Sequence, residues 1–222
     1  MQLNRRQALS GFGTISLGAL LAACADEDQP APATEEDMFG DESACTLTPE
    51  QTEGPYYFDV DKVRRDVREG RDGVALRLAL RVRDADCKPI ENAVVEIWHC
   101  DAGGSYSGFD DAAEQTTYLR GAQVTSPDGT VEFRTIYPGA YQGRTVHIHA
   151  KAHLDNQTLV TTQLYFDEDV SATVYEREPY SSAGPRDTFN DGDGIFDERT
   201  LLALSKEGDG YLGVISFDVE SA

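Results

Sequence analysis

Between residues 74 and 219 the chain is a succession of short apolar runs ended by turn-forming residues, and almost no segment repeats with the period of a long helix. The run 74–83 carries Arg77 and Arg81 among aliphatic residues, which is typical of a strand with one solvated face. The other strand candidates are the runs 93–98, 131–136, 146–152, 158–166 and 211–219. Many short strands between Gly, Pro and Asp turns predict an all-β fold, an antiparallel β-sandwich with long loops and little helix. Residues 198–205 are the one stretch in which we expect a short helix.

Residues 1–23 have the features of an export signal. Arg5 and Arg6 precede a short apolar stretch that ends in small residues, and this stretch is too short to cross a bilayer as a stable helix. The arginine pair resembles a twin-arginine signal, and the run Leu-Ala-Ala-Cys that ends at Cys24 resembles a bacterial lipoprotein box. We therefore expect an exported bacterial protein of the periplasm or cell envelope, held to the membrane by a lipid on Cys24. An ordinary secretory signal that ends near a cysteine is the alternative.

Residues 24–45 are expected to form an acidic, disordered tether between this anchor and a single folded domain at residues 46–222. From residue 26 to about residue 50 the chain carries nine Asp or Glu and no Lys or Arg, and such a segment cannot bury enough apolar surface to order itself. The formal charge of the whole chain is −21. This charge argues against nucleic acid as a partner, which needs a cationic face, and against adsorption to anionic lipid head groups.

Cys45, Cys87 and Cys100 would remain in the exported protein, where an oxidising compartment permits one disulfide. If residues 74–83 and 93–99 pair as neighbouring strands, Cys87 lies in their turn and Cys100 at the far end of the second strand. The two cysteines would then be roughly 20 Å apart, at about 3.3 Å per residue, which is too far to bond. We expect Cys45 to be bonded to one of them, and the sequence leaves open which.

One short segment combines side chains that suit a metal ion, since Tyr141, Arg144, His147 and His149 lie within nine residues. On a strand, His147 and His149 would point to the same face, about 6.6 Å apart along the backbone. Tyr106, in a glycine-rich turn upstream, would add a second phenol. Phenolate oxygen is a hard ligand that favours Fe(III), and only a strongly Lewis-acidic ion could deprotonate a phenol of pKa about 10 near neutral pH. The mixed phenol and imidazole set therefore indicates ferric iron.

Other interpretations of these residues stay open. His147 and His149 could be ordinary strand histidines, because His-x-His alone is a weak motif. They could also bind zinc with Cys100 or a carboxylate, as in a zinc hydrolase. A second acidic stretch nearly matches a calcium-binding loop through Asp187, Asp191, Gly192, Asp193 and Glu198. Phe189 occupies a required ligand position in that loop, so we expect a solvated acidic turn there instead.

Five segments of the chain form a recognisable series. They are Thr52-Glu-Gly-Pro-Tyr-Tyr57, Ile97-Trp-His-Cys-Asp101 with Gly104-Ser-Tyr106, Phe133-Arg-Thr-Ile-Tyr-Pro-Gly139, Arg144-Thr-Val-His-Ile-His149 and Thr162-Gln-Leu-Tyr-Phe166. They occur in the order seen in intradiol ring-cleavage dioxygenases, the family of the catechol and protocatechuate 3,4-dioxygenases. The resemblance spans about residues 46 to 219, and the chain looks closest to the exported, single-domain branch of that family.

The resemblance implies an enzyme in which a non-haem Fe(3+) ion is held by Tyr106, Tyr141, His147 and His149. In this family a catechol-type substrate displaces one tyrosinate, which matches Tyr141 here and helps to accept the substrate's proton. The aromatic ring is then cleaved with O2 to a cis,cis-muconate-type diacid. Members of the family often pair through their sandwich faces, so a homo-oligomer is a further expectation.

The resemblance also implies roles around the metal. Arg144 matches an active-site arginine that binds substrate and stabilises charge on its ring carbons, and Gln163 matches a glutamine near the iron-bound solvent. Tyr56 and Tyr57 fall where family members line the substrate pocket. The competing interpretations are a surface arginine at position 144 and core or rim aromatics for the two tyrosines. The alternative function is that of a non-enzymatic exported lipoprotein, which binds a metal or a catechol without turnover.

Overall fold

The computed structural model describes residues 38–39, 45–109 and 116–220. The expected export signal at residues 1–23, the lipidation site Cys24 and most of the expected tether lie outside the described residues. What is described belongs to one compact unit, Thr34–Ala222. None of the helices in this part of the chain is long and apolar enough to cross a membrane.

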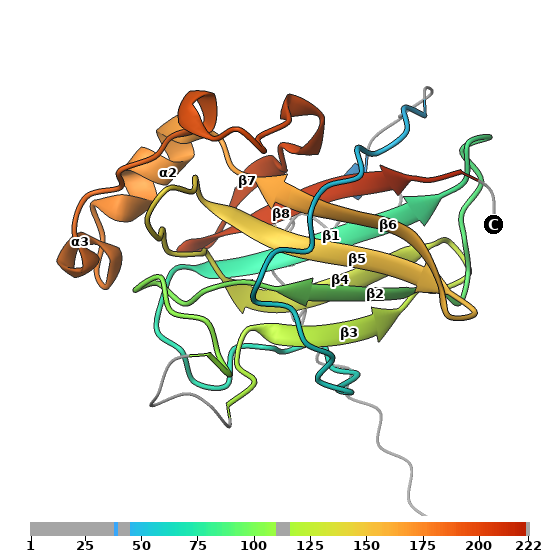
Figure 1. The fold of residues 1–222 in the computed structure, drawn as a ribbon, viewed down its shortest axis with the longest axis horizontal. Coiled ribbons are helices and arrows are strands. Elements are labelled where there is room, and N and C mark those ends of the chain that lie inside the picture. The colour runs from blue at the N-terminus through green and yellow to red at the C-terminus, as the bar shows by residue number, and fades with distance from the viewer. Residues whose placement is uncertain (1–37, 40–44, 110–115, 221–222) are drawn as a thin grey trace, which may run out of the picture. The chain divides into compact units, whose positions relative to one another are not determined.

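In the described part of the chain, eight strands form two four-stranded sheets (Figure 1). The first sheet has the strand order β4 (Thr130–Ile136), β1 (Ala75–Arg83), β8 (Gly210–Asp218) and β7 (Ala203–Glu207). The second has the order β3 (Arg120–Val124), β2 (Val94–Trp98), β5 (His147–Leu154) and β6 (Gln157–Tyr165). Neighbours in these sheets run antiparallel except for β1 and β8, which run parallel. The predicted all-β sandwich is confirmed, with this one parallel pair as a departure.

The alternation of residues along β1 shows how the sequence builds the core. Leu76, Leu78 and Leu80 are at most 1% exposed, and they belong to one apolar cluster that contains residues of both sheets. Arg77 alternates with them on the opposite face, where it forms ion pairs with acidic side chains of β4 and β7. Burial of each leucine stabilises the fold by about 1.5–3 kcal/mol, so the period-two pattern fixes which face of the strand is inside.

Six of the eight strands lie within two residues of the runs predicted from the sequence, whereas β3 and β7 are not evident from the pattern. The helix expected at residues 198–205 is wrong. Residues Glu198–Thr200 form only a 3-10 turn, η2, and the chain then enters β7, which pairs antiparallel with β8. Because β7 is mostly exposed, its hydrogen bonds to β8 decide its conformation, and the local apolar pattern does not.

The connection between β6 and β7 holds two short helices and two 3-10 turns. They are α2 (Glu168–Tyr175), α3 (Tyr180–Ala183) and the 3-10 turn η1 (Asn190–Gly192), which precedes η2. Asp167 begins α2 as its N-cap, since its side chain accepts hydrogen bonds from the amides of Asp169 and Val170. The same connection carries Asp193, immediately after η1.

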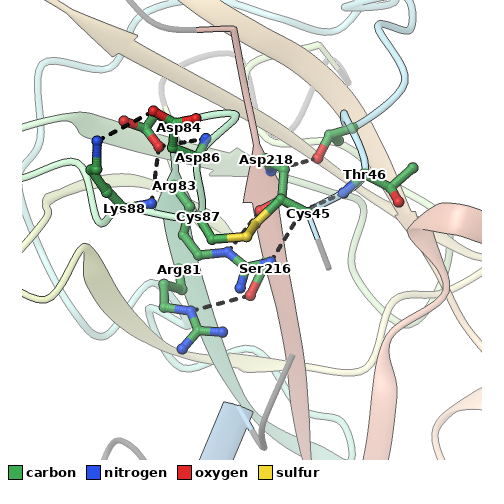
Figure 2. Close-up of a disulfide and its surroundings, with 11 residues drawn as sticks. Cys45, Thr46, Arg81, Arg83, Asp84, Asp86, Cys87, Lys88, Ser216 and Asp218 are labelled. Atoms are coloured by element: carbon green, nitrogen blue, oxygen red, sulfur yellow. Dashed lines mark hydrogen bonds and ion pairs between the residues drawn. A yellow bond between two sulfur atoms is a disulfide. The ribbon is translucent and has the colours of Figure 1, made fainter. Parts of the chain in front are cut away.

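The start of the domain is fastened to its last strand (Figure 2). A disulfide joins Cys45 to Cys87, which lies in the loop after β1. Beside this bond, the amide of Thr46 donates to Asp218 Oδ2 at 3.0 Å. The Asp218 carboxylate is itself held by Arg83, whose Nε lies 2.7 Å from Asp218 Oδ1. The expected bond from Cys45 is confirmed, and its partner is Cys87.

Cys100 is a free and buried thiol. The premise that residues 74–83 and 93–99 are neighbouring strands is wrong, because β1 and β2 belong to different sheets. The loop that holds Cys87 therefore crosses from one sheet to the other. This crossing places Cys87 beside the incoming chain at Cys45.

From the disulfide the chain runs over the outer face of the second sheet as an extended segment, residues 46–58, which we call the covering segment (Figure 1). Gln51 binds β6 twice: its amide donates to the Thr161 carbonyl at 2.7 Å, and its side-chain oxygen accepts from the Gln163 amide at 2.9 Å. Next to it, the Thr52 carbonyl accepts from Gln163 Nε2 at 3.0 Å. The covering segment thus closes over one face of β5 and β6.

Three residues of the expected tether are described, namely Met38, Phe39 and the disulfide-bonded Cys45, and all three contact the domain. Phe39 is 5% exposed and lies against Ala79 and Val214 on the outer face of the first sheet. The guanidinium carbon of Arg81 lies 4.5 Å from the centre of its ring. The segment that was expected to be solvated up to about residue 50 therefore contacts the domain at Phe39 and again from Thr46 onward.

Candidate functional site

One face of the second sheet turns away from the core and carries the expected histidine ligands. Trp98 of β2 lies opposite His149 of β5, and His149 lies opposite Gln163 of β6. Ile148, the next residue along β5, belongs to the core between the sheets, so His147 and His149 point to the outer face under the covering segment. The spacing of two residues therefore puts both imidazoles on the same face.

Three of the expected donor atoms meet on this face. His147 Nε2 lies 3.1 Å from His149 Nε2 and 3.1 Å from the hydroxyl oxygen of Tyr141. His147 Nδ1 lies 2.7 Å from the carbonyl oxygen of Thr145, to which it donates. Nε2 of the neutral His147 ring therefore presents a lone pair to its two neighbours. A cation bound jointly by His147 Nε2, His149 Nε2 and the Tyr141 oxygen would use these lone pairs.

Tyr106 supplies the fourth expected donor. Its side chain is 3% exposed, and its hydroxyl has no hydrogen-bond partner. The ring stacks on Tyr56 with 4.4 Å between centroids, and its centroid lies 5.6 Å from that of Tyr141 and 6.3 Å from that of His149. A buried hydroxyl without a partner costs about 1–3 kcal/mol, so a ligand for this oxygen is missing from the protein's own groups.

These four side chains fit ferric iron on two grounds: the orphaned Tyr106 hydroxyl and the hard, mixed phenol and imidazole set. Within the described ranges, no three His, Cys, Asp or Glu side chains gather in a group that could hold a metal ion. Cys100, the thiol considered as a zinc ligand, instead donates to the Gly139 carbonyl at 3.3 Å. Tyr106, Tyr141, His147 and His149 therefore remain the candidate ligands for ferric iron.

Burial controls the charge of these donors. Burial lowers the pKa of His147 to about 3 and holds the pKa of His149 well below its usual value. It raises the pKa of Tyr106 well above 10 and also raises the pKa of Tyr141. In the metal-free chain, both imidazoles are therefore neutral and both phenols keep their protons near pH 7. Ionisation of the phenols requires a cation beside them.

Arg144 reaches the same place from the turn before β5. Its NH1 lies 3.5 Å from His147 Nε2, and its NH2 donates to Gln163 Oε1. Its Nε donates to Asp193 Oδ2 at 2.8 Å. The solvated acidic turn expected around Asp193 is therefore wrong at this residue, because its side chain is only 2% exposed and is bound to an arginine. The ion pair between Asp193 and Arg144 could not be predicted from the sequence, because the acidic stretch resembled a calcium-binding loop and no spacing connects the two residues.

The other expected site residues lie at different distances from the histidines. Gln163 is buried, and its Oε1 also accepts from the Tyr165 hydroxyl at 3.2 Å. Tyr56 lies against Tyr106 and meets the Tyr141 ring edge-on, at 6.0 Å between centroids. Tyr57 points elsewhere: its ring contacts Trp98 and its hydroxyl donates to Glu96 at 3.2 Å.

Two residues that sequence reasoning did not assign to the site shape His149. Trp98 stacks on the His149 ring, with 5.0 Å between ring centroids and an interplanar angle of 5°. Gly54 of the covering segment has a φ of +74°, and a Cβ there would lie 3.1 Å from His149 Cε1. The glycine therefore lets the covering segment pass directly over the imidazole.

Replacement of Gly54 by alanine tests this close approach. We expect Gly54→Ala to destabilise the fold by about 1 kcal/mol through its positive φ, and to weaken iron binding by about tenfold as the methyl group displaces the imidazole. Gly70→Ala is the matched control, because Gly70 has a φ of +78° and a Cβ there would have no neighbour within 4 Å. Thermal unfolding and a competitive iron titration provide the measurements. Equal iron affinities in the two variants would contradict the steric argument.

Comparison with known proteins bears on this arrangement. A sequence model of a dioxygenase family matches residues 52–176, a range that contains all four expected metal ligands. A solved intradiol ring-cleavage dioxygenase from Tetranychus urticae has a TM-score of 0.76 and 34% sequence identity, over 79% of this chain and 95% of that one. The chain belongs to the intradiol ring-cleavage dioxygenase family. The resemblance seen in the sequence is thereby confirmed.

Other intradiol ring-cleavage dioxygenases and related proteins match over different lengths. The solved dioxygenase domain of a dioxygenase carbohydrate-binding protein fusion from Streptomyces sp. SirexAA-E has a TM-score of 0.64 and 32% identity, over 80% of this chain and 100% of that domain. Catechol 1,2-dioxygenase 1 of Acinetobacter lwoffii is 32% identical over an alignment of 148 residues, and the match covers 55% of this chain and 47% of the relative. The chain thus spans about half the length of the curated relatives it matches.

Proposed function

We propose that this protein is a non-haem Fe(III) intradiol dioxygenase, which uses O2 to cleave the ring of a catechol-type substrate to a cis,cis-muconate-type diacid. The observation that carries the proposal is the meeting of His147 Nε2, His149 Nε2 and the Tyr141 hydroxyl. The ring of Tyr106, whose buried hydroxyl has no hydrogen-bond partner, lies next to those of Tyr141 and His149. Relatives named as catechol and chlorocatechol 1,2-dioxygenases support the class of substrate.

Tyr106, Tyr141, His147 and His149 would hold the iron. Bound Fe(III) would act as a Lewis acid that draws electron density from a catecholate and makes the ring reactive towards O2. The neutral imidazoles, with His147 fixed by Thr145, present nitrogen lone pairs without losing a proton. Each phenol has to lose its proton on binding, so metal uptake releases protons.

The two tyrosines are suited to different tasks. Tyr106 is almost fully buried and stacked under Tyr56, so it is held as a permanent ligand. Tyr141 lies in a loop, is only partly buried, and keeps its hydroxyl within 3.1 Å of His147 Nε2. Tyr141 would therefore be the tyrosine whose oxygen accepts a proton from the catechol.

The NH1 group of Arg144 lies 3.5 Å from His147 Nε2, next to the proposed iron ligands. A guanidinium remains charged at any working pH, so it stabilises negative charge that develops on the substrate ring. Gln163 binds the NH2 group of Arg144 and is itself held by the Thr52 carbonyl, which limits the motion of the arginine. Tyr56 contributes an aromatic wall next to Tyr106.

Turnover by the purified full chain tests the proposal. Loaded with Fe(III), the protein should absorb visible light through tyrosinate charge transfer, and catechol should shift that band and cause O2 uptake with a muconate-type product. Catechol, chlorocatechol and protocatechuate should be compared. A spectral shift without O2 uptake would favour the non-enzymatic catechol-binding lipoprotein. A colourless protein that retains stoichiometric zinc would favour the zinc hydrolase.

A further inference from the structure

Asp193 is a buried carboxylate whose two oxygens accept three hydrogen bonds. Its Oδ2 accepts from Arg144 Nε at 2.8 Å and from the Thr145 amide at 2.9 Å, and its Oδ1 accepts from the Ile195 amide at 2.9 Å. The contact with Arg144 Nε is at the same time an ion pair. Residues 52–176, which match the family model, do not include Asp193.

The ion pair determines where the rest of the Arg144 guanidinium points. Nε is bound to Asp193 and NH2 to Gln163 Oε1, so two of the three nitrogens are taken. The remaining NH1 group faces His147, with 3.5 Å between NH1 and Nε2. Because the guanidinium is planar, the hydrogen bonds at Nε and NH2 also fix the direction in which NH1 points.

The turn that presents Asp193 is itself anchored to the strands of the site. Asn190 Nδ2 donates to the Phe166 carbonyl at 2.9 Å, immediately after β6. Asn190 Oδ1 accepts from the Thr145 hydroxyl at 2.7 Å, next to Arg144 in sequence. The turn is thus bonded to the chain just before β5 and just after β6. These two bonds hold Asp193 in a fixed position beside Arg144.

We propose that Asp193 is the positioning residue of Arg144, and that it holds the guanidinium so that NH1 meets the substrate beside His147. This rests on the proposed function, in which Arg144 stabilises charge on the catechol ring. The competing explanation is that Asp193 only stabilises its own turn through the Thr145 and Ile195 amides. The two explanations differ in whether a change at Asp193 acts through Arg144.

The test compares Asp193→Asn with Asp197→Asn in the iron-loaded full chain. Asparagine removes the charge that binds Arg144, and its single oxygen can keep the bond to only one of the two backbone amides, Thr145 or Ile195. Asp197 is a matched control, since it accepts from the Arg199 amide at 3.0 Å and pairs with the Arg199 guanidinium. We expect Asp193→Asn to lower kcat/KM for catechol by about 30-fold, mainly through kcat, and Asp197→Asn to change it less than about twofold.

Three further measurements distinguish positioning from a structural role. The visible band and the iron content of Asp193→Asn should match those of the wild type. In an Arg144→Ala background, Asp193→Asn should change kcat by less than about twofold, because its target is gone. Asp193→Glu, which keeps the charge, should recover part of the activity and serves if Asp193→Asn does not fold. An equal loss of kcat in both backgrounds, or no loss in either Asp193 variant, would overturn the proposal.

Failure of the proposed function would look different. A wild-type protein with neither O2 uptake nor a catechol-induced spectral shift would refute the dioxygenase proposal before any variant is compared. The link between Asp193 and Arg144 would then be tested by thermal unfolding of four proteins: the wild type, Asp193→Asn, Arg144→Ala and the double variant. A loss in Tm of the double variant that is smaller than the sum of the losses of the two single variants would support the link. A loss equal to that sum would overturn it.

Discussion

Replacement of Tyr106 by phenylalanine will weaken the visible band of the iron-loaded protein and remove nearly all of its activity without weakening the metal-free fold. The substitution removes only the hydroxyl, which is buried and has no hydrogen-bond partner. Loss of an unsatisfied buried hydroxyl should raise the free energy of unfolding of the metal-free chain by about 1 kcal/mol. Loss of a metal ligand should lower turnover of catechol by at least about 10³-fold.

Tyr137→Phe provides the matched control. Tyr137 is also fully buried, but its hydroxyl lies 2.7 Å from Ser171 Oγ. We expect this variant to lose about 1 kcal/mol of stability and to keep its colour and activity. Denaturant unfolding of metal-free protein, visible spectra and O2 uptake measure the two effects. If Tyr106→Phe destabilised the metal-free fold as much as Tyr137→Phe, the Tyr106 hydroxyl would have a partner and its role as a ligand would lose its basis.

Removal of the disulfide should have the largest effect on stability. Cys45 and Cys87 are separated by 42 residues in the chain. Cross-linking a loop of this length stabilises a fold by about 4 kcal/mol in the chain-entropy model. We expect the double variant Cys45→Ser/Cys87→Ser to unfold about 10 °C below the wild type in a thermal scan. The covering segment starts at this bond and holds Gln163 through Thr52, so catechol turnover should fall as well.

A reductant supplies the control for the disulfide. Wild-type protein treated with a thiol reductant should unfold at the temperature of the double variant, and the double variant should not respond to the reductant. Cys100 is buried and free, so it stays unchanged in both proteins. A wild type that is insensitive to reduction, or a double variant as stable as the wild type, would show that the hydrogen bonds of Thr46 and Thr48 to Asp218 suffice to fasten the segment.

Much of the architecture follows from local sequence pattern. Period-two alternation located β1, and the spacing of His147 and His149 placed both rings on one face of β5. The parallel pairing of β1 with β8 and the strand β7 escaped the pattern, because each depends on a partner far away in the chain. The conformation of residues 203–207 is decided by that partner and not by local propensity.

The same division applies to the candidate site. The Tyr and His residues owe their suitability as ligands to their own side chains, so residue type and spacing were sufficient to single them out as candidates. Asp193 and Gly54 have roles that depend on what they touch, namely Arg144 and His149. Such contacts join segments that are far apart in sequence, so local sequence patterns do not predict them. Phe39 is a further case, since an acidic context concealed an aromatic ring that packs on the first sheet.

Because Trp98 stacks on His149, its fluorescence should report whether the proposed metal site is occupied. The chain contains one tryptophan, so its indole emission arises from a single ring in contact with a proposed ligand. A ferric ion bound to that imidazole would quench the emission by electron or energy transfer. Fluorescence of the unlabelled protein would therefore follow occupancy of the centre directly, without a dye and without a substrate.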